Sequence, residues 1–239
     1  VLDMQQQSLV LLKNERDWLP LDKKALRKIL ITGPLAKETN YMTSRYGPQG
    51  LENITVFDGI SRFVGNDVEI AYAKGCETRN AGWPDSEIVP TPLTEDEIKQ
   101  MDEAIVAAED CDVIIAVLGE DERCTGESRS RTDLSLPGRQ QQLLEKLHAT
   151  GKPVVLVLIN GQPLTINWAD RNIPSILEAW FPGQLGGEAI ANTLFGVYNP
   201  GGRLSVTFPK SIGQIEYNFP FKPGSHGGQY TSGPNGSGD

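Results

Sequence analysis

Two unbroken apolar runs constrain the fold of this chain more than any other feature of its sequence. They read "VIIAVLG" at 113–119 and "KPVVLVLIN" at 152–160. Their content of Val and Ile and their lack of polar alternation are typical of strands that are buried on both faces. Strands of this kind occur in parallel sheets that helices cover on both sides.

Helical patterns separate these runs from further strand-like segments. Strands are predicted at 28–34, 68–73, 113–119, 152–160 and from 175 onward, and helices at 55–65, 94–110, 138–151 and 183–196. The clearest helix begins at Thr94, which forms a capping-box pattern with Glu97. Its expected buried stripe consists of Ile98, Met101, Ile105 and Ala108. The alternation predicts a three-layer α/β/α sandwich around a mostly parallel sheet of about five or six strands.

Both ends of the chain indicate a module of a longer protein. The segment 1–15 has no N-cap and is predicted to be the middle and end of a helix. The Gly/Ser-rich segment 211–239 is typical of a linker. We therefore expect an α/β-sandwich domain at 1–210, followed by a tail that leads to a further domain. Within it, 202–209 is expected to be a short edge segment, because Pro209 cannot lie in a central strand.

The composition argues against several classes of function. A formal net charge of −9 and a pI near 4.8 make nucleic acid an unexpected partner. No apolar segment approaches the roughly 20 residues of a membrane helix, so no membrane partner is expected. The three cysteines and two histidines show neither a disulfide pattern nor a metal-ligand spacing. We expect no metal and no other cofactor.

In a parallel sheet of this kind, ligands bind beyond the carboxyl ends of the strands. The loop at 119–137 follows a buried strand there and is rich in charge. Its charged residues are Glu120, Asp121, Glu122, Arg123, Glu127, Arg129, Arg131 and Asp133. The loop is either a solvated, salt-bridged connection or the source of a general acid/base. Glycoside hydrolysis normally needs two carboxylates, and the second would come from this loop or from another part of the protein.

Other chemistries lack their signatures. The chain contains neither G-x-G-x-x-G nor a P-loop, which makes a stand-alone nucleotide binder a remote alternative. It contains no G-x-S-x-G of a serine hydrolase. The stretch "PGQLGGEA" at 182–189 places glycines at a helix start, which suits either an anion or a tight turn with close packing. No histidine is clearly placed to activate Cys124 as a nucleophile.

Six stretches of the chain carry a family resemblance. They read "SLVLLKNERDWLPL", "ILITGPLA", "VIIAVLGE", "GESRSRTDLSLPGRQQQLL", "TGKPVVLVLINGQPL" and "ILEAWFPGQLGGEAIANTLFGVYNPGGRLSVTFP". In this order they resemble the second, α/β-sandwich domain of the family 3 glycoside hydrolases, the group of β-glucosidases and β-xylosidases. The stretches span nearly all of 8–209, and the last is the most specific. Bacterial β-glucosidases with an E-x-x-S-R-x-D loop are the most similar.

The resemblance implies a retaining glycosidase, most similar to a β-glucosidase, whose active site has two parts. A barrel domain of the longer chain would bind the glycosyl unit of a β-linked substrate and supply an Asp nucleophile. This domain would supply the general acid/base, for which Glu127 is the matching residue. Glu120 is the rival, because its "LGE" also matches the family, although its place at a strand exit favours a structural bond. The chain alone is expected to be inactive, and bacterial relatives are often exported to the periplasm.

Two more residues follow from the resemblance. Arg45 and Tyr46 lie in the loop after the first strand, where relatives place a leaving-group subsite. They are expected either to contact the leaving-group sugar or merely to pack on their neighbours. The alternative function for the whole domain is a structural or carbohydrate-binding module that buttresses the barrel.

The arginines of the charged loop are expected to lie away from the candidate acid/base. A general acid needs a raised pKa. An arginine such as Arg129 or Arg131 close to Glu127 would lower the pKa of its carboxyl group. We therefore expect both arginines to brace the loop by pairing with Asp133 or Glu122.

Overall fold

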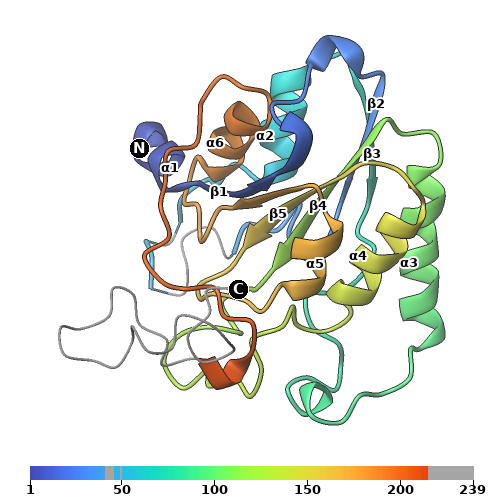
Figure 1. Cartoon of the computed structure of the whole chain (residues 1–239), viewed down its shortest axis with the longest axis vertical. Coiled ribbons are helices and arrows are strands. Elements are labelled where there is room, and N and C mark those ends of the chain that lie inside the picture. Colours follow the sequence, from blue (N-terminus) through green and yellow to red (C-terminus); the bar gives the residue numbers. More distant parts are fainter. Residues whose placement is uncertain (41–45, 49, 215–239) are drawn as a thin grey trace.

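The computed structural model describes residues 1–40, 46–48 and 50–214, and Figure 1 shows a sheet between two layers of helices. The strands are β1 (Val10–Asn14), β2 (Lys28–Thr32), β3 (Glu69–Ala73), β4 (Val113–Gly119), β5 (Val154–Ile159) and β6 (Ser175–Glu178). The α-helices are α1 (Leu2–Ser8), α2 (Val56–Val64), α3 (Glu95–Ala108), α4 (Gln140–Ala149), α5 (Asn167–Asn172) and α6 (Gly186–Leu194). Short 3-10 turns are η1 (Glu15–Asp17), η2 (Lys23–Ala25), η3 (Asp85–Glu87) and η4 (Ile212–Gln214).

The sheet is mostly parallel. Its strand order is β1-β6-β5-β4-β2-β3. Strand β1 pairs antiparallel with β6, and every other neighbouring pair is parallel. The carboxyl ends of β2 to β6 therefore lie along one edge of the sheet, and the loops that follow them meet there.

The two central strands are buried on both faces, as the continuous apolar runs predict. In β4, Val113, Ile115 and Val117 belong to the apolar core shared with α2 and α6. The alternate residues of the same strand, such as Ile114 and Leu118, belong to the core shared with α3, α4 and α5. One strand thus contributes to two separate cores, which confirms the predicted three-layer sandwich.

Glycines allow α2 and α6 to pack in close contact on one face of the sheet. A Cβ on Gly187 would lie 1.9 Å from the carbonyl oxygen of Thr55, and a Cβ on Gly59 would lie 2.1 Å from the carbonyl oxygen of Gly187. Both distances are far inside van der Waals contact. Gly187 of the "PGQLGGEA" stretch is thus explained by close packing, one of the two alternatives left open by the sequence.

Helix α3 begins where the sequence predicts it. The Oγ1 of Thr94 accepts a hydrogen bond from the backbone N–H of Glu97, and the Glu97 carboxylate accepts one from the N–H of Thr94. The expected buried stripe is only partly right. Met101 and Ala108 are buried, whereas Ile98 is 40% exposed and Ile105 is half-buried.

The first segment of the chain corrects one prediction. The segment 1–15 is not the end of a single helix, because α1 ends at Ser8 and the chain then forms β1. Pairing with β6 accounts for the strand, and that partner lies more than 160 residues away in the sequence. A local pattern contains no information about such a partner, and tertiary pairing overrides the helical period of "QQQSLVLL".

The predicted edge segment at 202–209 is also wrong, because no residue between 202 and 209 is in a strand. Strand β1 already occupies the edge beside β6. The segment instead packs through Phe208, whose ring makes an edge contact with Trp180. The short, polar helix α5 has no apolar period and was not predicted.

The tail predicted at 211–239 lies outside the described residues from 215 onward. Among the described residues, no helix combines the length and apolar character needed to cross a membrane.

Candidate active site at the carboxyl edge of the sheet

Three buried polar residues stand where adjacent strands end. Glu120 directly follows β4, Asn160 directly follows β5, and Glu178 is the last residue of β6. None of the three has any solvent exposure. Parallel strands bring residues from distant parts of the sequence together at such an edge, which is the usual place for a site in this class of fold.

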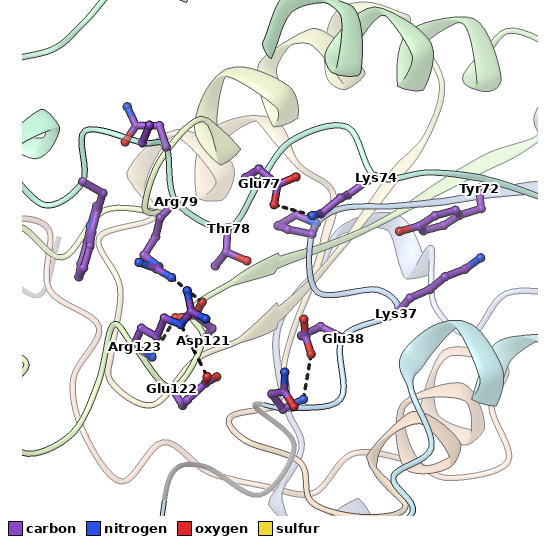
Figure 2. A pocket seen from close by; sticks show the side chains of 15 residues that line it. Lys37, Glu38, Tyr72, Lys74, Glu77, Thr78, Arg79, Asp121, Glu122 and Arg123 are labelled. Atoms are coloured by element: carbon purple, nitrogen blue, oxygen red, sulfur yellow. Dashed lines mark hydrogen bonds and ion pairs between the residues drawn. The ribbon is translucent and has the colours of Figure 1, made fainter. Parts of the chain in front are cut away.

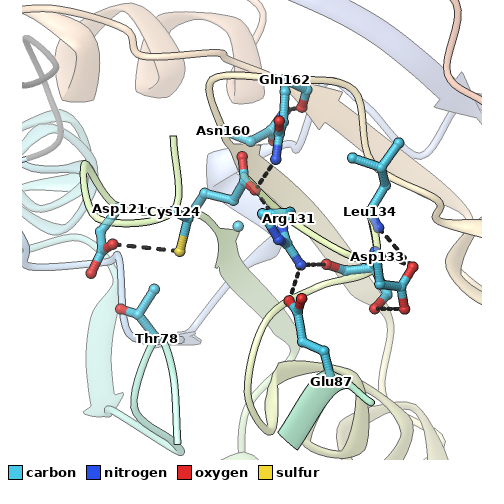
Figure 3. A network of polar contacts seen from close by, with 12 residues as sticks. Thr78, Glu87, Asp121, Cys124, Arg131, Asp133, Leu134, Asn160 and Gln162 are labelled. Atoms are coloured by element: carbon cyan, nitrogen blue, oxygen red, sulfur yellow. Dashed lines mark hydrogen bonds and ion pairs between the residues drawn. The ribbon is translucent and has the colours of Figure 1, made fainter. Parts of the chain in front are cut away.

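Glu120 is held by a buried ion pair. Its Oε1 accepts hydrogen bonds from Nη1 of Arg131 at 2.5 Å and from Nε2 of Gln162 at 2.8 Å. The other terminal nitrogen of Arg131, Nη2, donates to Oε1 of Glu87 at 2.5 Å and to the carbonyl oxygen of Ser135 at 2.8 Å. Figure 3 shows Arg131 between Glu87 and Gln162. The network ties the loop after β4 to η3 and to the loop after β5.

Burial sets the electrostatics of this network. The side chains of Arg131, Glu87 and Glu120 are 2%, 6% and 0% exposed. Burial raises the pKa of Glu120, and the Arg131 guanidinium opposes that rise. A buried carboxylate without a counter-charge is costly, and Arg131 supplies that counter-charge to Glu120.

The expected bracing of the loop is therefore wrong in its partners. Arg131 pairs with Glu120 and Glu87, not with Asp133 or Glu122. The physical reason is that a buried carboxylate such as Glu120 is costlier to leave without a counter-charge than a carboxylate in contact with solvent. Asp133 instead accepts from the backbone N–H groups of Leu134 and Ser135 and from the Ser135 hydroxyl.

Arg129 does not brace the loop through a side-chain ion pair of the kind we expected. Within the described ranges, no ion pair joins it to Asp133 or Glu122. Arg129 is exposed, and its backbone N–H donates to the carbonyl oxygen of Gly126 at 3.1 Å. It thus contributes to the turn around Glu127 through its main chain.

Glu127 lies on the exposed part of the same loop. Its backbone N–H donates to the Tyr46 hydroxyl at 2.6 Å. Gly126 and Ser128 on either side have positive φ angles of 114° and 59°, so the chain turns sharply here. The structure thus brings together Glu127 and Tyr46, two of the residues singled out in the sequence. Arg45 lies outside the described residues.

Cys124 is part of the same loop but is unsuited to nucleophilic chemistry. Its thiol is fully buried, and its Sγ lies 3.5 Å from Oδ1 of Asp121 (Figure 3). Burial and the neighbouring carboxylate raise the pKa of the thiol to about 12. Cys76 and Cys111 are also buried free thiols.

Glu178 was missed in the sequence. Its carboxylate accepts from the backbone N–H of Trp180 at 2.7 Å and from Nδ2 of Asn160 at 3.1 Å. Burial raises its pKa to about 8, against the effect of these two hydrogen bonds. The available signal was a single Glu inside the apolar run "SILEAW", an unusual position for a charge.

A polar cleft of about 740 Å³ opens beside the network, beyond the ends of β2, β3 and β4. Figure 2 shows Arg79 and Asp121 on one side of it and Lys74 and Glu77 on the other. Lys74 pairs with Glu77 at 2.5 Å, and Arg79 pairs with Asp121 at 3.2 Å. None of these residues except Asp121 stood out in the sequence. In the part of the chain that is described, no group of three or more His, Cys, Asp or Glu is arranged to hold a metal ion.

Comparisons with known proteins agree on one family. The glycosyl hydrolase family 3 C-terminal domain matches residues 9–235. A β-xylosidase of Formosa agariphila is 39% identical over 241 residues, which cover 96% of this chain and 31% of the relative. A periplasmic β-glucosidase of Salmonella typhimurium is 42% identical over 224 residues, which cover 89% of this chain and 28% of the relative.

Solved structures show the same likeness. A β-glucosidase of Erythrobacter marinus superposes with a TM-score of 0.77 at 36% identity, covering 99% of this chain and 32% of that one. A β-glucosidase of Listeria innocua, determined in complex with isofagomine, superposes with a TM-score of 0.76 at 31% identity, covering 90% and 27%. The chain spans about a third or less of the length of each of these relatives.

Proposed function

Since this chain belongs to the family of glycosyl hydrolase family 3 C-terminal domains, we propose that it is the acid/base half of a retaining β-glycosidase. The other half, a barrel domain elsewhere in a longer chain, supplies the nucleophile and holds the glycosyl unit. The substrate is a β-glucoside or β-xyloside. The relatives are named β-glucosidases and β-xylosidases, and one is named periplasmic, so we place this protein in an exported compartment as well.

The reaction assigns one role to this domain. In a retaining glycosidase, one carboxylate attacks the anomeric carbon and the second protonates the departing oxygen. The second group then removes a proton from the water that releases the sugar. In this proposal Glu127 is the second group.

One observation carries the assignment of Glu127 over Glu120. Glu120 is fully buried, and Arg131 and Gln162 hold its carboxylate. A group held in that way has no access to a departing oxygen, and its replacement would disturb the fold. Glu127 is exposed on the loop that Glu120 anchors, so a substrate held by a second domain can reach it.

The loop has an anchored base and an exposed tip. Arg131 fixes the base to β4 and η3, and the Tyr46 hydroxyl holds the backbone of the tip at Glu127. A general acid needs a raised pKa, which burial supplies. In our proposal, the barrel covers the tip when substrate is bound and removes water from Glu127.

A leaving-group series tests the proposal in the full-length protein. Glu127→Ala should reduce kcat/KM on the order of 10²–10⁴-fold for disaccharides, whose leaving groups need protonation. The loss should be much smaller for dinitrophenyl glycosides, whose leaving groups depart unprotonated. An equal loss on both substrates would contradict the assignment, and no loss on either would favour the buttress alternative.

A further inference from the structure

The polar cleft beside the candidate active site has no role in the chemistry described so far. Building on the proposed function, we propose that this cleft is a carbohydrate subsite. It holds the sugar units of a β-linked oligosaccharide that lie beyond the leaving-group unit. The protein would then prefer substrates of three or more units over disaccharides.

The charges of the cleft suit a neutral, hydroxyl-rich ligand. As many acidic as basic side chains line it. Two acid–base pairs, Lys74 with Glu77 and Arg79 with Asp121, already neutralise each other. A cleft for a phosphate or a polycation would show an excess of one sign. Paired side chains of this kind still offer donors and acceptors in fixed positions, which sugar hydroxyls use.

An aromatic side chain on the cleft wall is held in place by two neighbouring side chains. Trp83 lines the cleft, and its ring lies 5.1 Å from the guanidinium carbon of Arg79. Its Nε1 donates to Oε1 of Glu87 at 3.0 Å. The same Glu87 oxygen accepts from Arg131. The aromatic wall is therefore fixed by the network that anchors the acid/base loop.

Two loops contribute to both the cleft and the tip around Glu127. The loop after β4 supplies Asp121 and Arg123 to the cleft and continues to Glu127 four residues later. The loop after β2 supplies Asn40 to the cleft and Tyr46 to the backbone of Glu127. The cleft and Glu127 thus share two loops, and in this proposal the ligand runs from Glu127 into the cleft.

The dimensions agree with this use. A volume of about 740 Å³ falls in the range of roughly 300–1,000 Å³ that is typical of small-molecule sites. This volume is larger than a few water molecules occupy. The cleft opens at the same edge of the sheet as the loop around Glu127. One or two sugar units are the expected occupants.

The test compares substrate lengths in the full-length protein. The variant Lys74→Ala with Glu77→Ala removes one wall of the cleft, and both side chains are about half exposed, at 43% and 57%. We expect the variant to lower kcat/KM for cellotetraose or xylotetraose about tenfold more than it lowers kcat/KM for a nitrophenyl glycoside. The reason is that the tetrasaccharide loses two hydrogen-bonding groups. The loss should appear mainly in KM.

A matched control exists on the helices. Lys146 and Asp102 form an ion pair of nearly equal exposure, 40% and 59%, between α4 and α3. Lys146→Ala with Asp102→Ala should leave the preference for longer substrates unchanged. An unchanged tetrasaccharide preference in the cleft variant, or a wild-type protein that does not prefer tetrasaccharide, would overturn the inference.

A binding measurement separates this inference from the proposed function. Calorimetric titration of tetrasaccharide into the Glu127→Ala protein requires no turnover. Binding that the cleft variant weakens supports the subsite, even if the leaving-group series contradicts the role of Glu127. Binding that the cleft variant does not weaken, or no binding, overturns the subsite and leaves the acid/base proposal intact.

Discussion

At the scale of single residues, the buried guanidinium of Arg131 holds two carboxylates, Glu120 and Glu87. Arg131→Met would leave both carboxylates buried without a counter-charge. We predict that it lowers the free energy of unfolding by about 3–5 kcal/mol, the typical cost of breaking a buried pair from one side. Arg129→Met, on the exposed part of the same loop, should stay within about 0.5 kcal/mol. Urea denaturation measures both, and equal effects would contradict the anchoring role.

Glu178 makes stability depend on pH in an unusual direction. Its pKa of about 8 in the folded state lies above the ordinary value of about 4.3, so between these values the folded protein holds a proton that the unfolded chain has lost. Its contribution to stability is therefore fully present below about pH 4.3 and is lost as the pH rises to about 8. Glu178→Gln removes this titration. We predict that Tm of the variant minus Tm of the wild type increases between pH 5 and pH 8.5, and a constant difference would contradict the assignment.

The site was only partly predictable from single residues. The loop at 119–137 was visible because charge is dense directly after a buried strand, and the structure places Glu127 and Tyr46 together there. The partners of Arg131 were not predictable. Glu87 lies 44 residues away in the sequence, and nothing local distinguishes it from an exposed loop carboxylate. For Glu178 the local signal was a single charge inside an apolar run, but its partner Asn160 lies 18 residues away and has no pattern that links the two.

At the scale of elements, the contact between α2 and α6 depends on glycine. Gly187→Ala would place a Cβ 1.9 Å from the carbonyl oxygen of Thr55 and would force the helices apart. We predict a loss of about 1–3 kcal/mol in the free energy of unfolding, typical of overpacking. Gly201→Ala is the control, because a Cβ there meets nothing within 4 Å. Thermal and urea denaturation measure the stability of both variants. Equal stability of Gly187→Ala and Gly201→Ala would contradict the prediction.

The predictable elements were those whose pattern is local. Strands β4 and β5 are apolar on both faces, and the capping box of Thr94 marks the start of α3. Strand β1 was not predictable from local pattern, because its stability comes from pairing with β6, far away in the sequence. The segment 202–209 does not form the expected edge segment for the complementary reason, since β1 already covers the edge beside β6.

At the scale of the whole molecule, our proposal divides one active site between two domains. We predict that the 239-residue chain alone does not hydrolyse aryl β-glucosides, because in our proposal the nucleophile belongs to the other domain. Purified chain and full-length protein, assayed side by side with nitrophenyl β-glucoside and β-xyloside, test this directly. Turnover by the chain that disappears on substitution of one of its own carboxylates would contradict the division.

The central claim is that Glu127 is the general acid/base. In the full-length Glu127→Ala protein, an activated aryl glycoside should still form the glycosyl-enzyme, which then waits for a base to activate water. Azide needs no base, so it should accelerate turnover and yield the β-glycosyl azide. Glu120→Ala should lose stability and gain nothing from azide. Turnover that azide accelerates in the Glu127 variant, with β-glycosyl azide as the product, is the result we predict. Azide rescue of Glu120→Ala without rescue of Glu127→Ala would contradict the account and identify Glu120 as the acid/base.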